Sequence, residues 1–222
     1  MIENLFSNQV IALNATQEMW DGHLYPEEQE CIRKAVPKRR REFTAGRVCA
    51  REVLFRLGVF NFPLLVGQGR APLWPKNIVG SISHCNNLCV VAATKDKGIK
   101  GLGADVELAG PLEKSVTELV CTEKEMEWMA RNPSNIRSNL AKIIFSAKES
   151  FYKSISSFIQ CPLEFLDVQI VFNSLRNSFA VKLDNPHAAK SLNNYSLRGR
   201  YFFTEDYVYT AVEVRRPQYI IL

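Results

Sequence analysis

The feature that most constrains the fold is a set of short strand-like segments, and in those that close the chain apolar and polar residues alternate. Three of them, 78–84, 89–95 and 99–108, follow a helical stretch. Four more close the chain, at 167–172, 179–183, 195–204 and 207–214. Alternation with a period of two predicts strands. The turn at Asn86-Asn87 and the closing run of strands favour antiparallel pairing.

The stretches between these segments have helical spacing of their apolar residues. Pro37 is expected to interrupt the first helix and Gly58 to end it. Thr122 and Glu125 have the spacing of a capping box in the second. Helices are expected over 27–57, 113–131 and 138–157.

Helices and strands recur twice along the chain, which indicates an α+β fold made of two similar halves. We expect an N-terminal half over 1–100 and a C-terminal half over 101–222, packed side by side with a cleft between them. Clefts at such junctions are common ligand sites.

Composition limits the class of protein. The chain has 222 residues, 46% hydrophobic and 23% charged, which is typical of a soluble globular protein. A net charge of +5 is a mild bias toward anionic partners and argues against a dedicated nucleic-acid binder. The start has an acidic Glu3, and no apolar stretch reaches about 18 residues, so we expect neither an export signal nor a membrane span. The six scattered cysteines then favour free thiols in the cytoplasm.

The segment GADVE places two carboxylates, Asp105 and Glu107, two residues apart on the expected strand 99–108. Side chains at i and i+2 of a strand point to the same face. Two carboxylates so placed repel each other unless a cation lies between them. Oxygen ligands suit a hard ion, Mg²⁺ first. A solvated acidic strand edge would give the same pattern, and it stays open on these residues alone.

The segment FSAKESFYK, residues 145–153, places Lys148, Glu149 and Lys153 among aromatic and small residues of a helix. One explanation is an ion pair between Glu149 and Lys153, which are one helical turn apart. The other is that these charges converge on a ligand and a metal ion. In that case Glu149 is a third carboxylate for the cation of GADVE.

Arginines recur along the helix that follows Pro37, namely Arg39, Arg40, Arg47 and Arg51. Guanidinium groups suit phosphate because their donors form a planar fork. An ordinary solvated helix face is the alternative.

Three further residues add to the basic group. Arg70 lies beside a loop rich in Gly and Pro, and Ser83 and His84 end an apolar strand. A histidine there is more often a core residue, and adjacent strand residues point to opposite faces, which disfavours a Ser–His catalytic pair. Taken with the carboxylates, these groups describe a site for a polyphosphate ligand bridged by Mg²⁺.

Four segments, GRAPLWP, GSISH, GADVE and FSAKESFYK, occur in the order found in 4′-phosphopantetheinyl transferases of the Sfp type. The chain resembles that family over nearly its whole length, most closely the enterobactin synthase component D group. The family signature is G-[IV]-D, followed by [FW]-[SCT]-x-K-E-[SA]-x-x-K. The second part matches from Phe145 to Lys153. The first part keeps Asp105 but departs at Ala104, where the family usually has a branched residue.

The resemblance implies a pseudo-twofold fold with CoA between the halves. The reaction that it implies moves the 4′-phosphopantetheine arm of CoA to a serine of an acyl or peptidyl carrier protein and releases adenosine 3′,5′-bisphosphate. The closest relatives serve siderophore-making peptide synthetases, so these carriers are expected first, with polyketide and fatty-acid carriers open. A monomer is expected, because one chain holds both halves.

The resemblance also implies roles for individual residues. Asp105, Glu107 and Glu149 would hold Mg²⁺ as part of the catalytic group. Glu149 would take the proton of the carrier serine, and Lys153 would bind the α-phosphate. The other phosphate contacts that it implies are Arg39, Arg47, Arg70, Ser83, His84 and Lys148.

Three other classes of protein would share part of this pattern. A nucleic-acid-binding module explains the basic run but not the carboxylates, which would repel a phosphate backbone without a metal. A nucleotidyl kinase is disfavoured because the chain has no GxxxxGK[ST] loop. A catalytically inactive relative that only binds CoA or a carrier protein is the main alternative.

Overall fold

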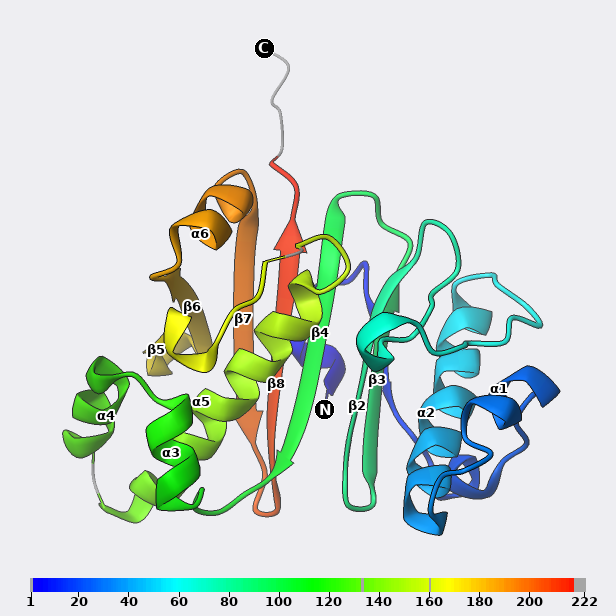
Figure 1. Ribbon diagram of the computed structural model, residues 1–222, viewed down its shortest axis with the longest axis horizontal. Helices are drawn as coiled ribbons and strands as arrows, with labels where there is room; N and C mark the ends of the chain where they lie inside the picture. Colours follow the sequence, from blue (N-terminus) through cyan, green and yellow to red (C-terminus); the bar gives the residue numbers. More distant parts are fainter. Residues whose placement is uncertain (1, 133, 160, 218–222) are drawn as a thin grey trace. The chain divides into compact units, whose positions relative to one another are not determined.

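The computed structural model describes residues 2–132, 134–159 and 161–217. It confirms the α+β class: antiparallel strands form two separate sheets, and helices pack on them (Figure 1). The chain divides into two compact units, Met1–Lys97 and Gly98–Leu222.

The first unit is a three-stranded sheet with a long helix against it. Strand β3 is central, in the order β1-β3-β2. Helix α2 packs on this sheet, where Gly46 leaves room for the side chain of Ile82. The elements are η1 (Ile2–Leu5), β1 (Ile11–Asn14), η2 (Gln17–Asp21), α1 (Pro26–Cys31), α2 (Pro37–Arg56), η3 (Gln68–Arg70), β2 (Val79–Cys85) and β3 (Leu88–Thr94).

The second unit is a five-stranded antiparallel sheet in the order β4-β8-β7-β6-β5. Helix α5 lies across β4 and β8 (Figure 1). The elements are β4 (Ile99–Leu108), α3 (Lys114–Val120), α4 (Glu123–Ala130), α5 (Ser134–Ile155), η4 (Phe165–Asp167), β5 (Val168–Asn173), η5 (Ser174–Arg176), β6 (Ser178–Leu183), α6 (Pro186–Leu192), β7 (Ser196–Phe203) and β8 (Tyr207–Arg215).

Helix α5 lies close to β4 because small residues line both surfaces. A Cβ atom on Gly101 would overlap the carbonyl oxygen of Ser154, and one on Gly103 would overlap that of Ser150. The helix backbone therefore rests directly on the strand at these two glycines. Any side chain at either position would push the helix away from the sheet.

The spacing of contact residues along α5 also matches the spacing along β4. Two strand residues advance about 6.6 Å, and four helix residues advance about 6 Å. Residues 101, 103 and 105 of β4 therefore meet residues 154, 150 and 146 of α5 in turn. This match delivers the carboxylate of Asp105 to the helix at Ser146.

Most of the elements expected from the sequence are present. The interruption of the first helix at Pro37 and the capping box of Thr122 and Glu125 are confirmed, as are the seven strands expected. Strand β1 and helix α6 were not expected. Both are short, and β1 pairs with β3 through residues that show little alternation.

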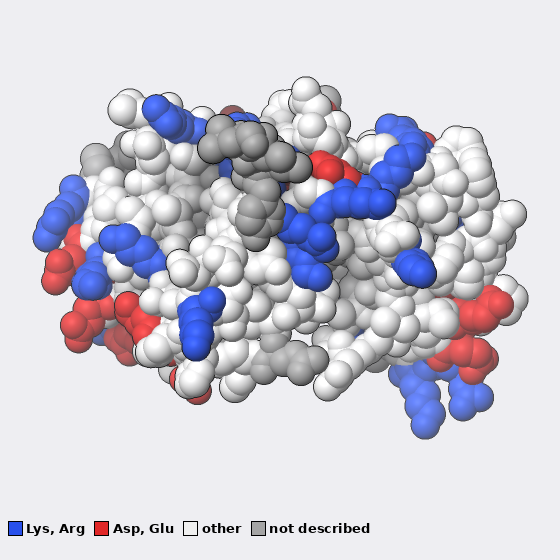
Figure 2. Space-filling view, turned by 90° about the horizontal axis from the view of Figure 1, so that it is seen from above, with Lys and Arg blue, Asp and Glu red and all other residues white. Residues whose placement is uncertain are grey.

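The face shown in Figure 2 carries several small groups of Lys and Arg side chains. Asp or Glu side chains lie beside several of these groups. This pattern is that of an ordinary solvated surface. None of the helices in the described ranges is both long and apolar enough to cross a lipid bilayer.

The contact between α5 and β4 gives a first prediction. Gly103→Ala should lower the free energy of unfolding by at least about 3 kcal/mol, because the new methyl group meets helix backbone that cannot rotate away. Urea unfolding followed by circular dichroism measures the change. Leu108→Ala, at the partly exposed end of the same strand, is the control. A Gly103→Ala protein as stable as this control would contradict the packing described.

Candidate active site

The two carboxylates of GADVE lie on the face of β4 that α5 covers. Asp105 and Glu107 alternate with buried Ala104 and Val106, which point to the other face. Ala104, where the family signature usually has a branched residue, therefore fills a space on the far side of the sheet from Asp105.

Asp105 is 2% exposed and is held from two sides. Lys153 donates to its Oδ1 at 2.6 Å, and Ser146 donates to its Oδ2 at 2.8 Å. Lys153 thus pairs with Asp105. This contact joins one charge of the strand to one charge of the helix, and convergence of the whole group on a ligand and a metal ion stays a prediction.

The other two carboxyl groups have raised pKa values. Burial and the negative charge of Asp105 raise the pKa of Glu107 from 4.5 to about 7. Burial raises the pKa of Glu149, and Asp105 adds to the effect while Lys153 opposes it. Burial is the largest cause of both shifts, and the lysines nearby, Lys153 at both groups and Lys142 at Glu107, offset it only in part.

The donor chemistry of this site fits a hard cation. Within the described ranges, no three His, Cys, Asp or Glu side chains are grouped closely enough to hold a metal alone. Asp105, Glu107 and Glu149 therefore do not form a ready-made cage. Mg²⁺ usually takes only one or two protein carboxylates and completes its shell with water and phosphate oxygens. The pair on β4 meets that requirement, and a divalent cation would offset both the burial of Glu107 and the repulsion from Asp105 that raise its pKa.

Lys148 corrects one expectation from the sequence. Its side chain is 0% exposed, so it cannot reach a phosphate group in solvent. Its Nζ donates three hydrogen bonds, to Glu125 Oε2 at 2.8 Å and to the carbonyl oxygens of Val120 and Phe165 at 2.7 and 2.9 Å. The prediction that Lys148 contacts phosphate is wrong, because its ammonium group is buried and already has three acceptors.

Glu125 is the partner that makes this burial possible. Besides Lys148, it accepts from the backbone N–H groups of Thr122 and Ile170, both at 2.7 Å. One buried ion pair thus joins the end of α3, the start of α4, η4, β5 and the middle of α5. It fixes the turn of α5 that carries Glu149.

In the first unit, Arg39 and His84 lie together. Arg39 Nη1 is 2.7 Å from His84 Nε2, and His84 Nδ1 is 3.7 Å from Glu42 Oε2. Since arginine can only donate, Nε2 is the acceptor and the ring proton lies on Nδ1. The Arg39 side chain stays 42% exposed and can still meet an anion. Ser83 is buried and, as the neighbour of His84 on β2, points to the opposite face.

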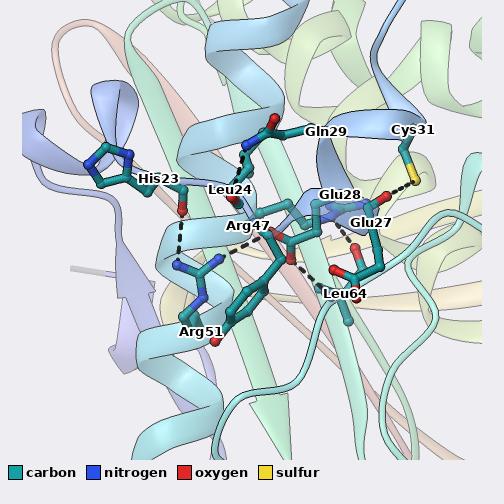
Figure 3. Close-up of polar contacts among 10 residues, drawn as sticks. His23, Leu24, Glu27, Glu28, Gln29, Cys31, Arg47, Arg51 and Leu64 are labelled. Carbon is teal, nitrogen blue, oxygen red and sulfur yellow. Dashed lines mark hydrogen bonds and ion pairs between the residues drawn. The ribbon is translucent and has the colours of Figure 1, made fainter.

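Arg47 lies inside the first unit (Figure 3). It is 5% exposed, its Nε donates to the carbonyl oxygen of Leu64 at 2.6 Å, and its guanidinium lies 4.1 Å from the centre of the Phe43 ring. Burial lowers its pKa to about 10. A phosphate contact from Arg47 stays a prediction, while these contacts give it a role in holding the loop at Leu64.

Glu28 binds the backbone N–H group of the same Leu64. Its Oε1 accepts from the backbone N–H of Leu64 at 2.9 Å, and its Oε2 accepts from Arg51 at 3.1 Å (Figure 3). Both backbone polar groups of Leu64 are therefore bound by buried charged side chains. Arg70 lies farther along the same connection, exposed and with a positive φ of 65°.

Sequence reasoning missed three residues of these networks: Ser146, Glu28 and Glu42. A signal existed for Ser146, because serines 146, 150 and 154 recur every four residues and mark a helix face for close packing. Glu28 and Glu42 lie on charged helical stretches and carry no such signal.

Two family models match the chain. The 4′-phosphopantetheinyl transferase N-terminal domain matches residues 27–94, and the 4′-phosphopantetheinyl transferase superfamily matches residues 101–212. The second match includes the carboxylates of β4 and the whole of FSAKESFYK.

Curated relatives agree with these models. The chain is 35% identical to 4′-phosphopantetheinyl transferase Svp of Streptomyces mobaraensis, over 87% of this chain and 80% of that one. It is 33% identical to 4′-phosphopantetheinyl transferase Npt of Nocardia iowensis, over 69% and 68%. It is also 33% identical to enterobactin synthase component D of Escherichia coli K12, over 63% and 65%.

These matches place the chain among enzymes of the transferase class. The chain belongs to the 4′-phosphopantetheinyl transferase superfamily.

The burial of Lys148 gives a second prediction. Lys148→Met should lower the free energy of unfolding by about 3–5 kcal/mol, because it leaves the Glu125 carboxylate buried without its cation. Urea unfolding measures this, with Lys124→Met on the exposed side of α4 as a control that should change stability by less than about 0.5 kcal/mol. Unchanged stability together with weaker CoA binding would restore Lys148 as a phosphate ligand.

The raised pKa of Glu107 gives a third prediction. Between pH 4.5 and about 7 the folded protein holds a proton that the unfolded chain releases. This contribution to stability is complete below pH 4.5 and is lost as the pH rises through 7. Glu107→Gln removes the loss, so in EDTA the variant should melt at least about 2 °C above wild type at pH 8 and near it at pH 4.5. Thermal unfolding of both proteins at both pH values measures the difference, and an equal difference at the two pH values would contradict the assignment.

Proposed function

We propose that this enzyme transfers the 4′-phosphopantetheine arm of CoA to a serine hydroxyl of an acyl or peptidyl carrier protein. The serine oxygen forms a bond to the β-phosphorus of CoA. The bond from that phosphorus to the bridging oxygen breaks, and adenosine 3′,5′-bisphosphate leaves. The serine proton passes to the enzyme, so the reaction balances without a further reactant.

The observation that carries the proposal is the placement of FSAKESFYK against GADVE. Glu149 and Lys153 are one turn apart on α5, and Lys153 reaches Asp105 at 2.6 Å. This contact supports the proposal that the base Glu149, the cation Lys153 and the metal-binding carboxylate Asp105 act together, from one helix and one strand. Membership of the superfamily supports assigning these groups to pantetheinyl transfer.

Glu149 is proposed as the general base. Burial raises its pKa, which brings its proton affinity nearer to the operating pH and so favours proton transfer. Lys153 is proposed to donate a hydrogen bond to the α-phosphate in addition to its bond with Asp105. The α-phosphate gains negative charge as the leaving group departs. Both side chains are half-buried, so each can face a ligand while anchored in the unit.

Asp105, Glu107 and Glu149 are proposed to hold Mg²⁺ together with the CoA pyrophosphate. When bound, the ion neutralises charge on the phosphate oxygens. The chain's own contribution is the fixed orientation of Asp105 and the partly buried setting of Glu107.

Arg39 and His84 are proposed as phosphate contacts in the first unit, with Arg70 and Ser83 as further candidates. Arg39 keeps donors available at the surface, and Glu42 keeps the His84 ring oriented. The Arg47 guanidinium is proposed to meet phosphate through its small exposed part.

The partner is proposed to be a carrier domain of nonribosomal peptide synthesis, with siderophore synthesis as the first pathway to test. Similarity to enterobactin synthase component D of E. coli supports this choice. Carrier domains of polyketide or fatty-acid synthesis would use the same chemistry, and the assay below includes them. A monomeric enzyme stays a prediction.

The proposal predicts a defined mass change. A purified apo carrier protein incubated with the enzyme, CoA and Mg²⁺ should gain the mass of one phosphopantetheine arm by intact mass spectrometry, and EDTA should prevent the gain. Glu149→Gln should slow the reaction at least about 100-fold, because the base is lost, while thermal unfolding stays near that of wild type.

Glu123→Gln, an exposed carboxylate on α4, is the matched control and should transfer at the wild-type rate. No mass gain on peptidyl, polyketide or fatty-acid carriers would overturn the proposal and leave an inactive CoA-binding relative. Near-normal transfer by Glu149→Gln would remove Glu149 from the mechanism.

A further inference from the structure

Three buried serines face β4 from one side of α5, at positions 146, 150 and 154. Ser150 donates its hydroxyl to the carbonyl oxygen of Ala147 at 2.9 Å, and Ser154 donates to that of Phe151 at 2.7 Å. Both hydroxyls thus donate their hydrogen bond to a carbonyl oxygen of their own helix. Ser146 differs, because its hydroxyl reaches across to the strand.

The acceptor of the Ser146 hydroxyl is Oδ2 of Asp105, at 2.8 Å. Thr210 lies directly opposite Asp105 in the register of β4 and β8, so its side chain shares the face that meets α5. Its Oγ1 is 2.8 Å from the carbonyl oxygen of Ser146 and 2.9 Å from the hydroxyl oxygen of the same residue.

The number of hydrogens available gives this series of hydrogen bonds a direction. A hydroxyl has one hydrogen to donate. If the Ser146 hydrogen goes to Asp105, the Ser146 oxygen can only accept from Thr210. The Thr210 hydrogen is then shared between the two oxygens of Ser146, and the chain runs from Thr210 to Ser146 to Asp105.

Burial keeps this series of hydrogen bonds in place. Ser146 and Thr210 are 0% exposed and Asp105 is 2% exposed, so bulk water cannot replace a lost donor. Lys153 binds the other oxygen of Asp105 at 2.6 Å. The relay of hydrogen bonds from Thr210 through Ser146 therefore holds Oδ2 of Asp105, while Lys153 binds Oδ1.

We propose that Thr210 and Ser146 are positioning residues that fix the carboxylate of Asp105 and so set the affinity of this site for a divalent cation. The inference rests on the proposed function only for its catalytic consequence. Hydrogen-bond partners of metal-ligating groups typically control affinity or activity by about 10- to 100-fold. The same range is expected here.

The test is binding of Mn²⁺, measured by electron paramagnetic resonance with and without saturating CoA. Ser146→Ala and Thr210→Val should weaken Mn²⁺ about 10- to 100-fold. Thr210→Ser keeps the hydroxyl and should bind Mn²⁺ as wild type does, even if loss of the methyl group lowers its stability. In the transfer assay the first two variants should lose kcat while KM for CoA changes little.

Ser150→Ala and Ser154→Ala are the matched controls, since each removes a buried hydroxyl from the same helix face without touching Asp105. Both should keep wild-type affinity for Mn²⁺. Equal losses in the controls, an equal loss in Thr210→Ser, or unchanged binding in Thr210→Val would each overturn the proposal. Wild-type protein that binds no Mn²⁺ in either condition would overturn it as well.

The same measurements separate this inference from the proposed function. If wild type binds Mn²⁺, Thr210→Val weakens it, and no carrier is modified, then the relay stands and the transfer reaction fails. If carriers are modified at the wild-type rate by Thr210→Val, the relay fails and the reaction stands.

Discussion

The direct contact between the backbone of α5 and the glycines of β4 is the constraint on which the second unit depends. Gly101 and Gly103 bring the helix down onto the strand. The match between four helix residues and two strand residues carries that contact on to Ser146 and Asp105. Two carboxylates that would otherwise lie on an exposed strand are thereby set against a helix that supplies a lysine and a hydroxyl. The chemistry of the site follows from close packing.

Buried charges do the remaining positioning, in both units and in the same way. Lys148 and Glu125 bind backbone groups of several elements, and Glu28 and Arg47 bind both polar groups of Leu64. A buried ion pair such as Lys148–Glu125 adds little to stability on balance, because desolvation offsets its attraction. Its hydrogen bonds do connect elements that are far apart in the chain. Lys148, which resembles a ligand in the sequence, thus holds in place the turn of α5 that carries Glu149.

The sequence predicted the strands of the second unit, the capping box and the segments that meet at Asp105, because period and turn chemistry are local properties. It failed at Lys148, since a lysine beside Glu149 in a motif looks the same whether it points to solvent or into the core. Which side it takes depends on Glu125, 23 residues earlier in the chain. Thr210 was out of reach for a similar reason: only the pairing of β4 with β8 places it opposite Asp105.

The step-for-step match between α5 and β4 also bears on how such a chain can change its length. One residue inserted between Ser146 and Lys153 would turn the rest of the helix by about 100°, carrying the lysine away from Asp105. One residue inserted between Gly103 and Asp105 would turn the carboxylate to the other face of the sheet. The connection after Leu108 is under no such restriction, so insertions and deletions can accumulate there while both segments keep a fixed length.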